Sequence, residues 1–278
     1  MPGVATVEAL AAAVRKFDVA SLGLRVEPEA DWAVRESLRR TGLVLLGERH
    51  GVEQTPVLAE ELIGWFGVGG IALEWSERLR PWLDRWLADG IVAAAVDDVG
   101  MEVWGGDGRL SAGHLVVLRR LAAAGLMITL IDGATDLEPP APGETAEAMQ
   151  RRWWSDRDAA MADRVLAAPD MPGGRLVVAG SLHTRLEPLP VTDPRTAHIG
   201  VPMGAEVARR RPGLCSIECV YGTGHFYNLG LRRSVEDLRV QHLDGPRLIM
   251  HSAEHAPGEL LLLVPSPRAA TVPHRKLD

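Results

Sequence analysis

Short apolar segments alternate with longer amphipathic segments along most of this chain. The apolar segments have the length and composition of buried strands and lie at residues 42–47, 70–73, 126–131, 175–179 and 214–220. Between them, apolar residues recur at helical spacing, which predicts helices at residues 4–17, 31–40, 52–66, 81–89, 111–124, 144–168 and 204–211. Asp31 and Ser111 are typical N-cap residues for two of these helices.

The remaining segments of the chain predict a loop and a hairpin. Residues 134–143 contain three prolines and are predicted to be a loop. The last two apolar runs, 247–250 and 259–264, are separated by a turn-like segment and predict a β-hairpin.

Strands that read as continuous apolar runs and alternate with helices are typical of a parallel sheet covered on both faces. We therefore predict an α/β fold: a mostly parallel central sheet flanked by helices, with a C-terminal β-hairpin. No internal repeat or change of composition divides the chain. The prediction is a single α/β domain over residues 1–278, with N-terminal helices in 1–40, a core in 41–230 and a C-terminal extension in 231–278.

Composition narrows the class of protein. Of 278 residues, 46% are hydrophobic and 24% are charged, which excludes disorder for most of the chain. The net charge of −7 argues against a nucleic-acid partner. No apolar run approaches the ~20 residues of a membrane span. The first 17 residues lack a basic segment before their apolar stretch, so we expect a helix rather than a signal peptide, and a cytoplasmic protein without membrane contact.

The two cysteines, Cys215 and Cys219, fall in one predicted strand. Residues four apart in a strand lie ~13 Å apart, too far for a disulfide. We expect both thiols to be free and buried.

Ionisable residues follow four of the predicted strands directly. The first strand ends in Glu48, Arg49 and His50, the second at Glu74, the third at Asp132, and the fourth is followed by His183. Open parallel sheets bind ligands at the carboxyl ends of their strands, so these side chains are predicted to meet at one edge and form an active site.

Two kinds of chemistry fit this set of residues. Converging carboxylates repel, so protons, arginines or a cation must share the site; Arg49 and Arg78 lie within a few residues of the glutamates and could be the counter-charges that hold substrate oxygens. Two imidazoles beside a carboxylate can act as general base and acid for attack of water on a carbonyl. The same four side chains, Glu48, His50, Glu74 and His183, could instead hold a divalent metal.

Several other motifs are weaker. His225 follows the fifth strand and could face the site, and Trp75 is interpreted as core or pocket wall. Ser181 lacks the G-x-S-x-G elbow of a hydrolase nucleophile. Residues 251–255 match the H-x-x-E-H spacing of a zinc peptidase, but they lie between two strand-like runs, so we predict a turn. Gly-rich phosphate-binding motifs are absent.

Taken together, the motifs resemble a known superfamily. The segments concerned are GLVLLGERHG, GIALEW, the helix with Arg157 and Asp158, RLVVAGSLHT and VPMG. Their order along the chain is similar to that of the erythromycin-esterase/ChaN-like superfamily, relatives of the TraB and Tiki proteins. The resemblance spans residues 41–230. It implies a hydrolytic α/β fold in which the first histidine, His50, acts as base and glutamates assist. Members are ester hydrolases of macrolide rings, haem-binding proteins or metal-dependent peptidases.

We therefore predict a cytoplasmic hydrolase for an ester, lactone or amide of a small natural product, in its biosynthesis or inactivation. The predicted catalytic residues are His50, Glu48, Glu74 and His183, and the predicted substrate-binding residues are Arg49, Arg78, Trp75, Asp132 and His225. We expect no cofactor and no tightly held metal, and a small molecule as the partner; the oligomeric state stays open. The alternatives are a metal-dependent peptidase with the same residues as ligands, or a non-enzymatic haem- or ligand-binding protein.

Overall fold

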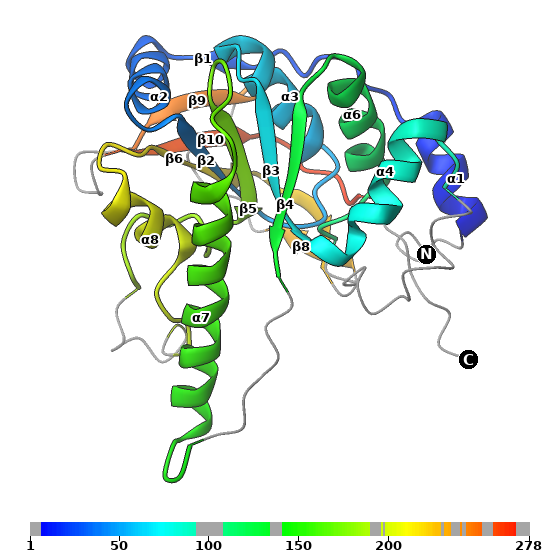
Figure 1. Cartoon of the computed structure of the whole chain (residues 1–278). Helices are drawn as coiled ribbons and strands as arrows, with labels where there is room; N and C mark the ends of the chain where they lie inside the picture. The colour runs from blue at the N-terminus through cyan, green and yellow to red at the C-terminus, as the bar shows by residue number, and fades with distance from the viewer. Residues whose placement is uncertain are drawn as a thin grey trace.

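The computed structural model describes residues 7–92, 108–133, 141–189, 196, 198–228, 231–234, 240, 243–251 and 258–270. An eight-stranded sheet with the order β1-β9-β10-β6-β2-β5-β3-β4 forms the centre of the molecule (Figure 1). Its strands are β1 (Arg25–Val26), β2 (Leu43–Glu48), β3 (Gly70–Ser76), β4 (Met127–Asp132), β5 (Arg175–Gly180), β6 (Ser216–Tyr221), β9 (Arg247–Met250) and β10 (Glu259–Val264).

Most of the sheet is parallel. The six neighbouring strands from β10 to β4 run in one direction, whereas β9 pairs antiparallel with β10, and β1 pairs parallel with β9. The mostly parallel sheet and the antiparallel pair of C-terminal strands are thus confirmed. A separate antiparallel ribbon, β7 (Gly224–Tyr227) with β8 (Leu231–Ser234), was not predicted.

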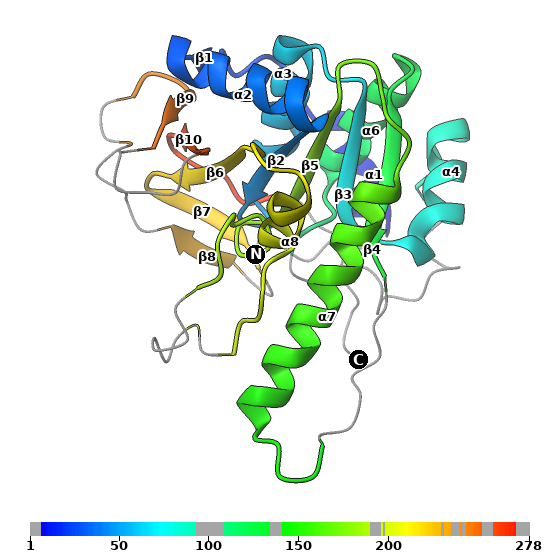
Figure 2. The same ribbon diagram turned by 60° about the vertical axis from the view of Figure 1, so that its left-hand side comes forward.

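Helices cover both faces of the sheet, as Figures 1 and 2 show from two sides. One apolar cluster joins the sheet to α1 (Val7–Lys16), α2 (Pro28–Thr41), α3 (Thr55–Phe66), α4 (Arg80–Asp89) and α6 (Ala112–Ala123). A second cluster on the opposite face joins it to α7 (Ala146–Ala167) and α8 (Met203–Arg210). Successive residues of a strand point to opposite faces of the sheet, so Leu45 packs in the second cluster and Leu46 in the first.

Helix α7 is longer than the sheet it packs on. All of its buried residues lie from Arg157 onward, in the half that contacts the sheet and α8. Its N-terminal half extends past the edge at which β4 ends (Figures 1 and 2). This half of α7 therefore stands beside the carboxyl ends of the parallel strands.

Where they are described, the predicted helix boundaries agree to within two residues, with two corrections: α2 begins at Pro28 rather than residue 31, and α3 begins at Thr55 rather than residue 52. Ser111 is the N-cap of α6, as predicted, and accepts a hydrogen bond from the backbone N–H of His114. Asp31 is not an N-cap, because α2 begins three residues earlier, at Pro28, whose fixed φ suits a first helical position. The Asp31 carboxylate instead accepts hydrogen bonds from Arg35 and Trp65.

Other predictions have mixed outcomes. Cys215 and Cys219 are free and buried, as predicted. Residues 4–6 of the first predicted helix, 134–140 of the predicted loop and 252–257 of the predicted turn lie outside the described residues. No helix in the described ranges is long and apolar enough to cross a membrane.

Candidate active site

The carboxyl edge of the parallel strands collects the predicted site residues. Glu48 is the last residue of β2, Asp132 is the last residue of β4, and His183 lies in the turn after β5, where its N–H bonds to the Gly180 carbonyl. Glu74 precedes the end of β3 at an irregularity: after Leu73 pairs with Leu130, the next pair joins Ser76 to Asp132, so β3 carries one extra residue. Such bulges re-aim side chains beside functional sites.

His50 lies between two glutamates. Its Nδ1 is 3.1 Å from Glu48 Oε1, and its Nε2 is 3.9 Å from Glu74 Oε2. The ring fits there because residue 180 is glycine: a Cβ on Gly180 would lie 3.0 Å from His50 Nε2. The closer Glu48 orients the ring and favours a proton on Nδ1, which leaves the lone pair of Nε2 on the side of Glu74.

Glu74 is the centre of the network, with only 2% of its surface exposed. Its Oε1 accepts hydrogen bonds from Arg157 at 2.7 Å and Arg109 at 2.9 Å, and its Oε2 accepts one from the Gly180 N–H at 2.7 Å. Burial acts to raise the pKa of Glu74, but the positive charges around it outweigh burial and hold this pKa well below its usual range. The groups that lower this pKa are His183, Arg109, His50 and Arg157, of which the two guanidinium groups are always cationic. Glu74 is therefore a permanent buried anion.

His183 is held by a buried carboxylate and an aromatic ring. Its Nδ1 lies 2.8 and 2.9 Å from the two oxygens of Asp158, which also accepts the N–H of Met203. Burial raises the pKa of Asp158 and the hydrogen bond from His183 opposes this rise. Trp154 stacks on the imidazole, with ring centroids 4.8 Å apart. His183 Nε2 lies 3.2 Å from an Arg157 guanidinium nitrogen and 3.4 Å from Glu74 Oε1.

Two arginines supply the counter-charges, but they are not the predicted ones. Arg157 binds Asp132 through Nε at 3.1 Å and Nη2 at 2.7 Å, and Arg109 reaches the same carboxylate at 3.3 Å. Arg49 instead donates to Ser234 Oγ and lies over the Tyr221 and Phe226 rings. Arg78 is exposed on the 3-10 turn after β3 and forms no ion pair within the described residues. Neither Arg49 nor Arg78 forms an ion pair with Glu48 or Glu74 among the described residues, and their role in holding substrate oxygens stays a prediction.

The other predicted residues divide between the cluster and the surface. Trp75 is buried, donates its indole N–H to the Arg109 carbonyl at 3.0 Å and so fixes the backbone of that arginine. His225 is exposed on β7, opposite Arg233, and has no contact with the cluster among the described residues.

His114, which the sequence analysis did not select, lies behind Glu48 and packs edge-on against Trp75. A Ser-x-x-His pattern at the start of a predicted helix was the only signal for it.

The arrangement of the possible ligand side chains is relevant to metal binding. Within the described ranges, no group of three or more His, Cys, Asp or Glu side chains is arranged to hold a metal ion. The proposed ligand set of Glu48, His50, Glu74 and His183 includes a Glu74 whose oxygens already accept bonds from two guanidinium groups and a backbone N–H.

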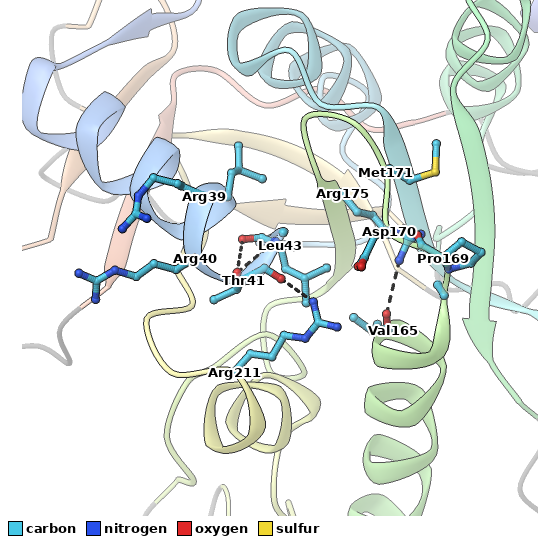
Figure 3. Close-up of a pocket in the computed structure, with 13 residues that line it drawn as sticks. Arg39, Arg40, Thr41, Leu43, Val165, Pro169, Asp170, Met171, Arg175 and Arg211 are labelled. Carbon is cyan, nitrogen blue, oxygen red and sulfur yellow. Dashed lines mark hydrogen bonds between the residues drawn. The ribbon is translucent and has the colours of Figure 1, made fainter.

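A second cavity lies at the opposite, amino edge of the same strands. It has a volume of about 260 Å³, and Figure 3 shows it between the start of β2, the start of β5 and the ends of α2 and α7. Four arginines line it: Arg39, Arg40, Arg175 and Arg211. Arg175 donates to the carbonyls of Val165 and Pro169, and Arg211 donates to that of Thr41. Arg175 and Arg211 thus satisfy carbonyls at helix ends, whereas Arg39 and Arg40 pair with Glu36, and no histidine lines this cavity.

Solved structures place this architecture within a known fold. The chain superposes on a mutant of the erythromycin esterase EreC in its open conformation, with a TM-score of 0.57, 13% identity, and coverage of 86% of this chain and 94% of that one. A succinoglycan biosynthesis protein matches with a TM-score of 0.53 and 11% identity over 95% of this chain and 97% of the other. A Bacillus cereus protein matches with a TM-score of 0.52 and 11% identity over 84% and 90%.

At 11–13% identity, these matches show that the chain shares its fold with the three proteins. The comparison with protein-family models gives no match, and neither does the comparison with curated protein sequences.

Proposed function

We propose that this protein is a hydrolase that cleaves an ester, lactone or amide of a small natural product by general acid–base catalysis. The observation that carries the proposal is the position of His50, with Nδ1 held by Glu48 and Nε2 turned toward the Glu74 side of the cluster. A histidine fixed in this way by a carboxylate on one nitrogen is ready to act as a base on the other.

The proposed steps use residues of this edge only. His50 Nε2 takes a proton from a water molecule, and the resulting hydroxide attacks the carbonyl carbon of the substrate. Glu48 stabilises the imidazolium that forms. The oxyanion of the tetrahedral intermediate is stabilised by Arg109, whose side chain is 27% exposed and thus reachable by substrate. When the carbon–oxygen or carbon–nitrogen bond breaks, the imidazolium returns its proton to the leaving alcohol or amine.

The remaining cluster residues would hold this arrangement. Glu74 and Asp132 fix Arg109 and Arg157 in place, and Asp158 with Trp154 holds His183 beside them. One structural neighbour is named an erythromycin esterase, which supports an ester or lactone as the bond cleaved. A cytoplasmic location and a role in the biosynthesis or inactivation of a natural product belong to the same proposal.

Hydrolysis assays test the proposal. The purified protein is offered a panel of aryl esters, lactones and amides, and the best substrate is used to compare variants. We expect His50→Ala to lose at least ~100-fold in turnover while remaining folded. Arg209→Gln, on the exposed surface of α8, is the matched surface control and keeps the wild-type rate. Full turnover by His50→Ala, or no turnover of any substrate by the wild-type protein, would overturn the proposal.

We further propose that catalysis does not depend on a tightly held metal, because arginines already balance the buried carboxylates. Elemental analysis is expected to find less than one metal ion per chain, with activity unchanged after dialysis against a chelator. Stoichiometric metal, with activity lost on chelation and restored by the ion, would favour the metal-dependent peptidase instead.

A further inference from the structure

His114 is a buried histidine that the proposed reaction does not use. It lies in the first turn of α6, is 5% exposed, and packs edge-on against Trp75 at a centroid distance of 5.8 Å. A buried imidazole needs hydrogen-bond partners for its nitrogens, so each of its contacts indicates where its proton resides.

The first nitrogen contacts the helix cap. Ser111 Oγ lies 2.9 Å from His114 Nδ1 and also accepts the backbone N–H of His114 at 3.4 Å. A hydroxyl that accepts the backbone N–H still has its own proton to donate, and the nearest acceptor is Nδ1. A neutral imidazole whose Nδ1 accepts carries its proton on Nε2.

The second nitrogen faces Glu48. His114 Nε2 is 4.0 Å from Glu48 Oε2, a buried oxygen with no hydrogen-bond partner in the described part of the chain. With the proton on Nε2, an N–H dipole points at this carboxylate across 4.0 Å, which is a charge–dipole contact. The opposite tautomer would set the lone pair of Nε2 against that of Oε2. Burial lowers the pKa of His114, which agrees with a neutral ring.

Glu48 is therefore placed between two histidines, with Oε1 on His50 and Oε2 toward His114. We propose that His114 is a positioning residue: its Nε2–H fixes the Glu48 carboxylate, which in turn holds the proton of neutral His50 on Nδ1 and leaves the His50 Nε2 lone pair for a water molecule. The effect on turnover rests on the proposed function, whereas the effect on the His50 tautomer does not.

Two-bond ¹H–¹⁵N correlation spectra of the ¹⁵N-histidine-labelled full chain report which ring nitrogen carries the proton. At a pH where both rings are neutral, we expect His114 as the Nε2–H form and His50 as the Nδ1–H form. In His114→Leu, the fraction of His50 protonated on Nε2 is expected to rise about tenfold, since the N–H dipole that faces Glu48 is lost. In His114→Gln it stays at the wild-type value, because the amide can accept from Ser111 and donate to Glu48.

Ser37→Ala is the matched control. Ser37 is as buried as Ser111, but its hydroxyl donates to the Leu43 carbonyl at the other end of β2. This variant is expected to lose stability without any change in the His50 tautomer. Ser111→Ala is expected to release His114 into a mixture of tautomers, and this readout remains if His114→Leu does not fold.

Kinetics separate this inference from the proposed function. With a hydrolysed substrate, kcat of His114→Leu falls about tenfold with KM unchanged, and His114→Gln recovers it. An unchanged His50 tautomer in His114→Leu, or a wild-type His114 protonated on Nδ1, overturns the inference. If the tautomers shift as expected while the wild-type protein hydrolyses nothing, the inference stands and the proposed function fails.

Discussion

The two edges of the parallel sheet both carry buried arginines, but those arginines bind different partners. At the carboxyl edge, Arg109 and Arg157 bind the carboxylates of Glu74 and Asp132. At the amino edge, Arg175 and Arg211 bind backbone carbonyls at helix ends (Figure 3). The first arrangement pairs guanidinium groups with carboxylates beside two histidines, whereas the second satisfies backbone carbonyls at helix ends. A cavity lined with arginines is thus not by itself evidence of a functional site. The groups that the arginines bind distinguish the two edges of the sheet.

The largest effect is expected from removing the central arginine of the carboxyl edge. Arg157→Met leaves Asp132 and Glu74 with one guanidinium instead of two, and buried carboxylates that lose their partner are costly. The free energy of unfolding should fall by about 3 kcal/mol, measured by urea denaturation, and turnover should fall at least 100-fold. Wild-type stability in this variant would contradict the assignment of Arg157 as the main counter-charge.

A smaller effect is expected from adding one carbon beside His50. In Gly180→Ala the new Cβ would meet His50 Nε2 at 3.0 Å and Glu74 Oε2 at 3.5 Å, so the ring must move. Stability should fall by about 1 kcal/mol and turnover by about tenfold. Gly64→Ala is the matched control: it lies within α3 with nothing within 4 Å of the new Cβ, and should raise stability by about 0.5 kcal/mol. Equal behaviour of both variants would refute the crowding argument.

The loss of folding stability at acidic pH is expected to depend on His114. Burial lowers its pKa in the folded protein, so the unfolded chain binds a proton more readily. The stability that comes from this group is present above the usual histidine pKa of about 6.5 and is lost as pH falls below it toward the folded value. His114→Gln should therefore flatten the fall in melting temperature between about pH 6.5 and 5. If wild type and variant lose stability in parallel over this range, other groups cause the loss.

The smallest effect is expected at the amino edge. Arg211→Met removes the hydrogen bond to the Thr41 carbonyl at the end of α2 and should lower stability by about 1 kcal/mol. Turnover should be unchanged, because this side chain lies at the opposite end of the strands from the histidines. A loss of turnover as large as that of Arg157→Met would remove the functional distinction between the two edges.

The strand ends of the carboxyl edge were predictable because each buried strand is a continuous apolar run that stops at its ionisable residue. Glu48 and Glu74 therefore lie on either side of His50, and Asp132 and His183 join the same cluster through contacts with Arg157 and Glu74. Whether they act as catalysts stays a prediction.

The arginines were less accessible to sequence reasoning. Arg157 is on a predicted helix, but periodicity indicates that a helix exists and not which side chains reach a neighbouring sheet edge. Arg109 follows a segment without periodic pattern, so nothing in its local sequence places it near Glu74. His114 was missed because one histidine at the start of a helix has no distinguishing pattern; only the three-dimensional contact with Glu48 reveals it.

The two halves of helix α7 have different surroundings. Its inner half carries Arg157 and Asp158, whose hydrogen bonds tie it to the chemistry of the sheet edge, while its outer half projects beyond that edge with Trp153 only partly buried. Insertions or deletions of whole turns in the outer half leave the register of the inner half unchanged. The length and surface of this projection can therefore vary without altering the cluster of charged residues at the sheet edge.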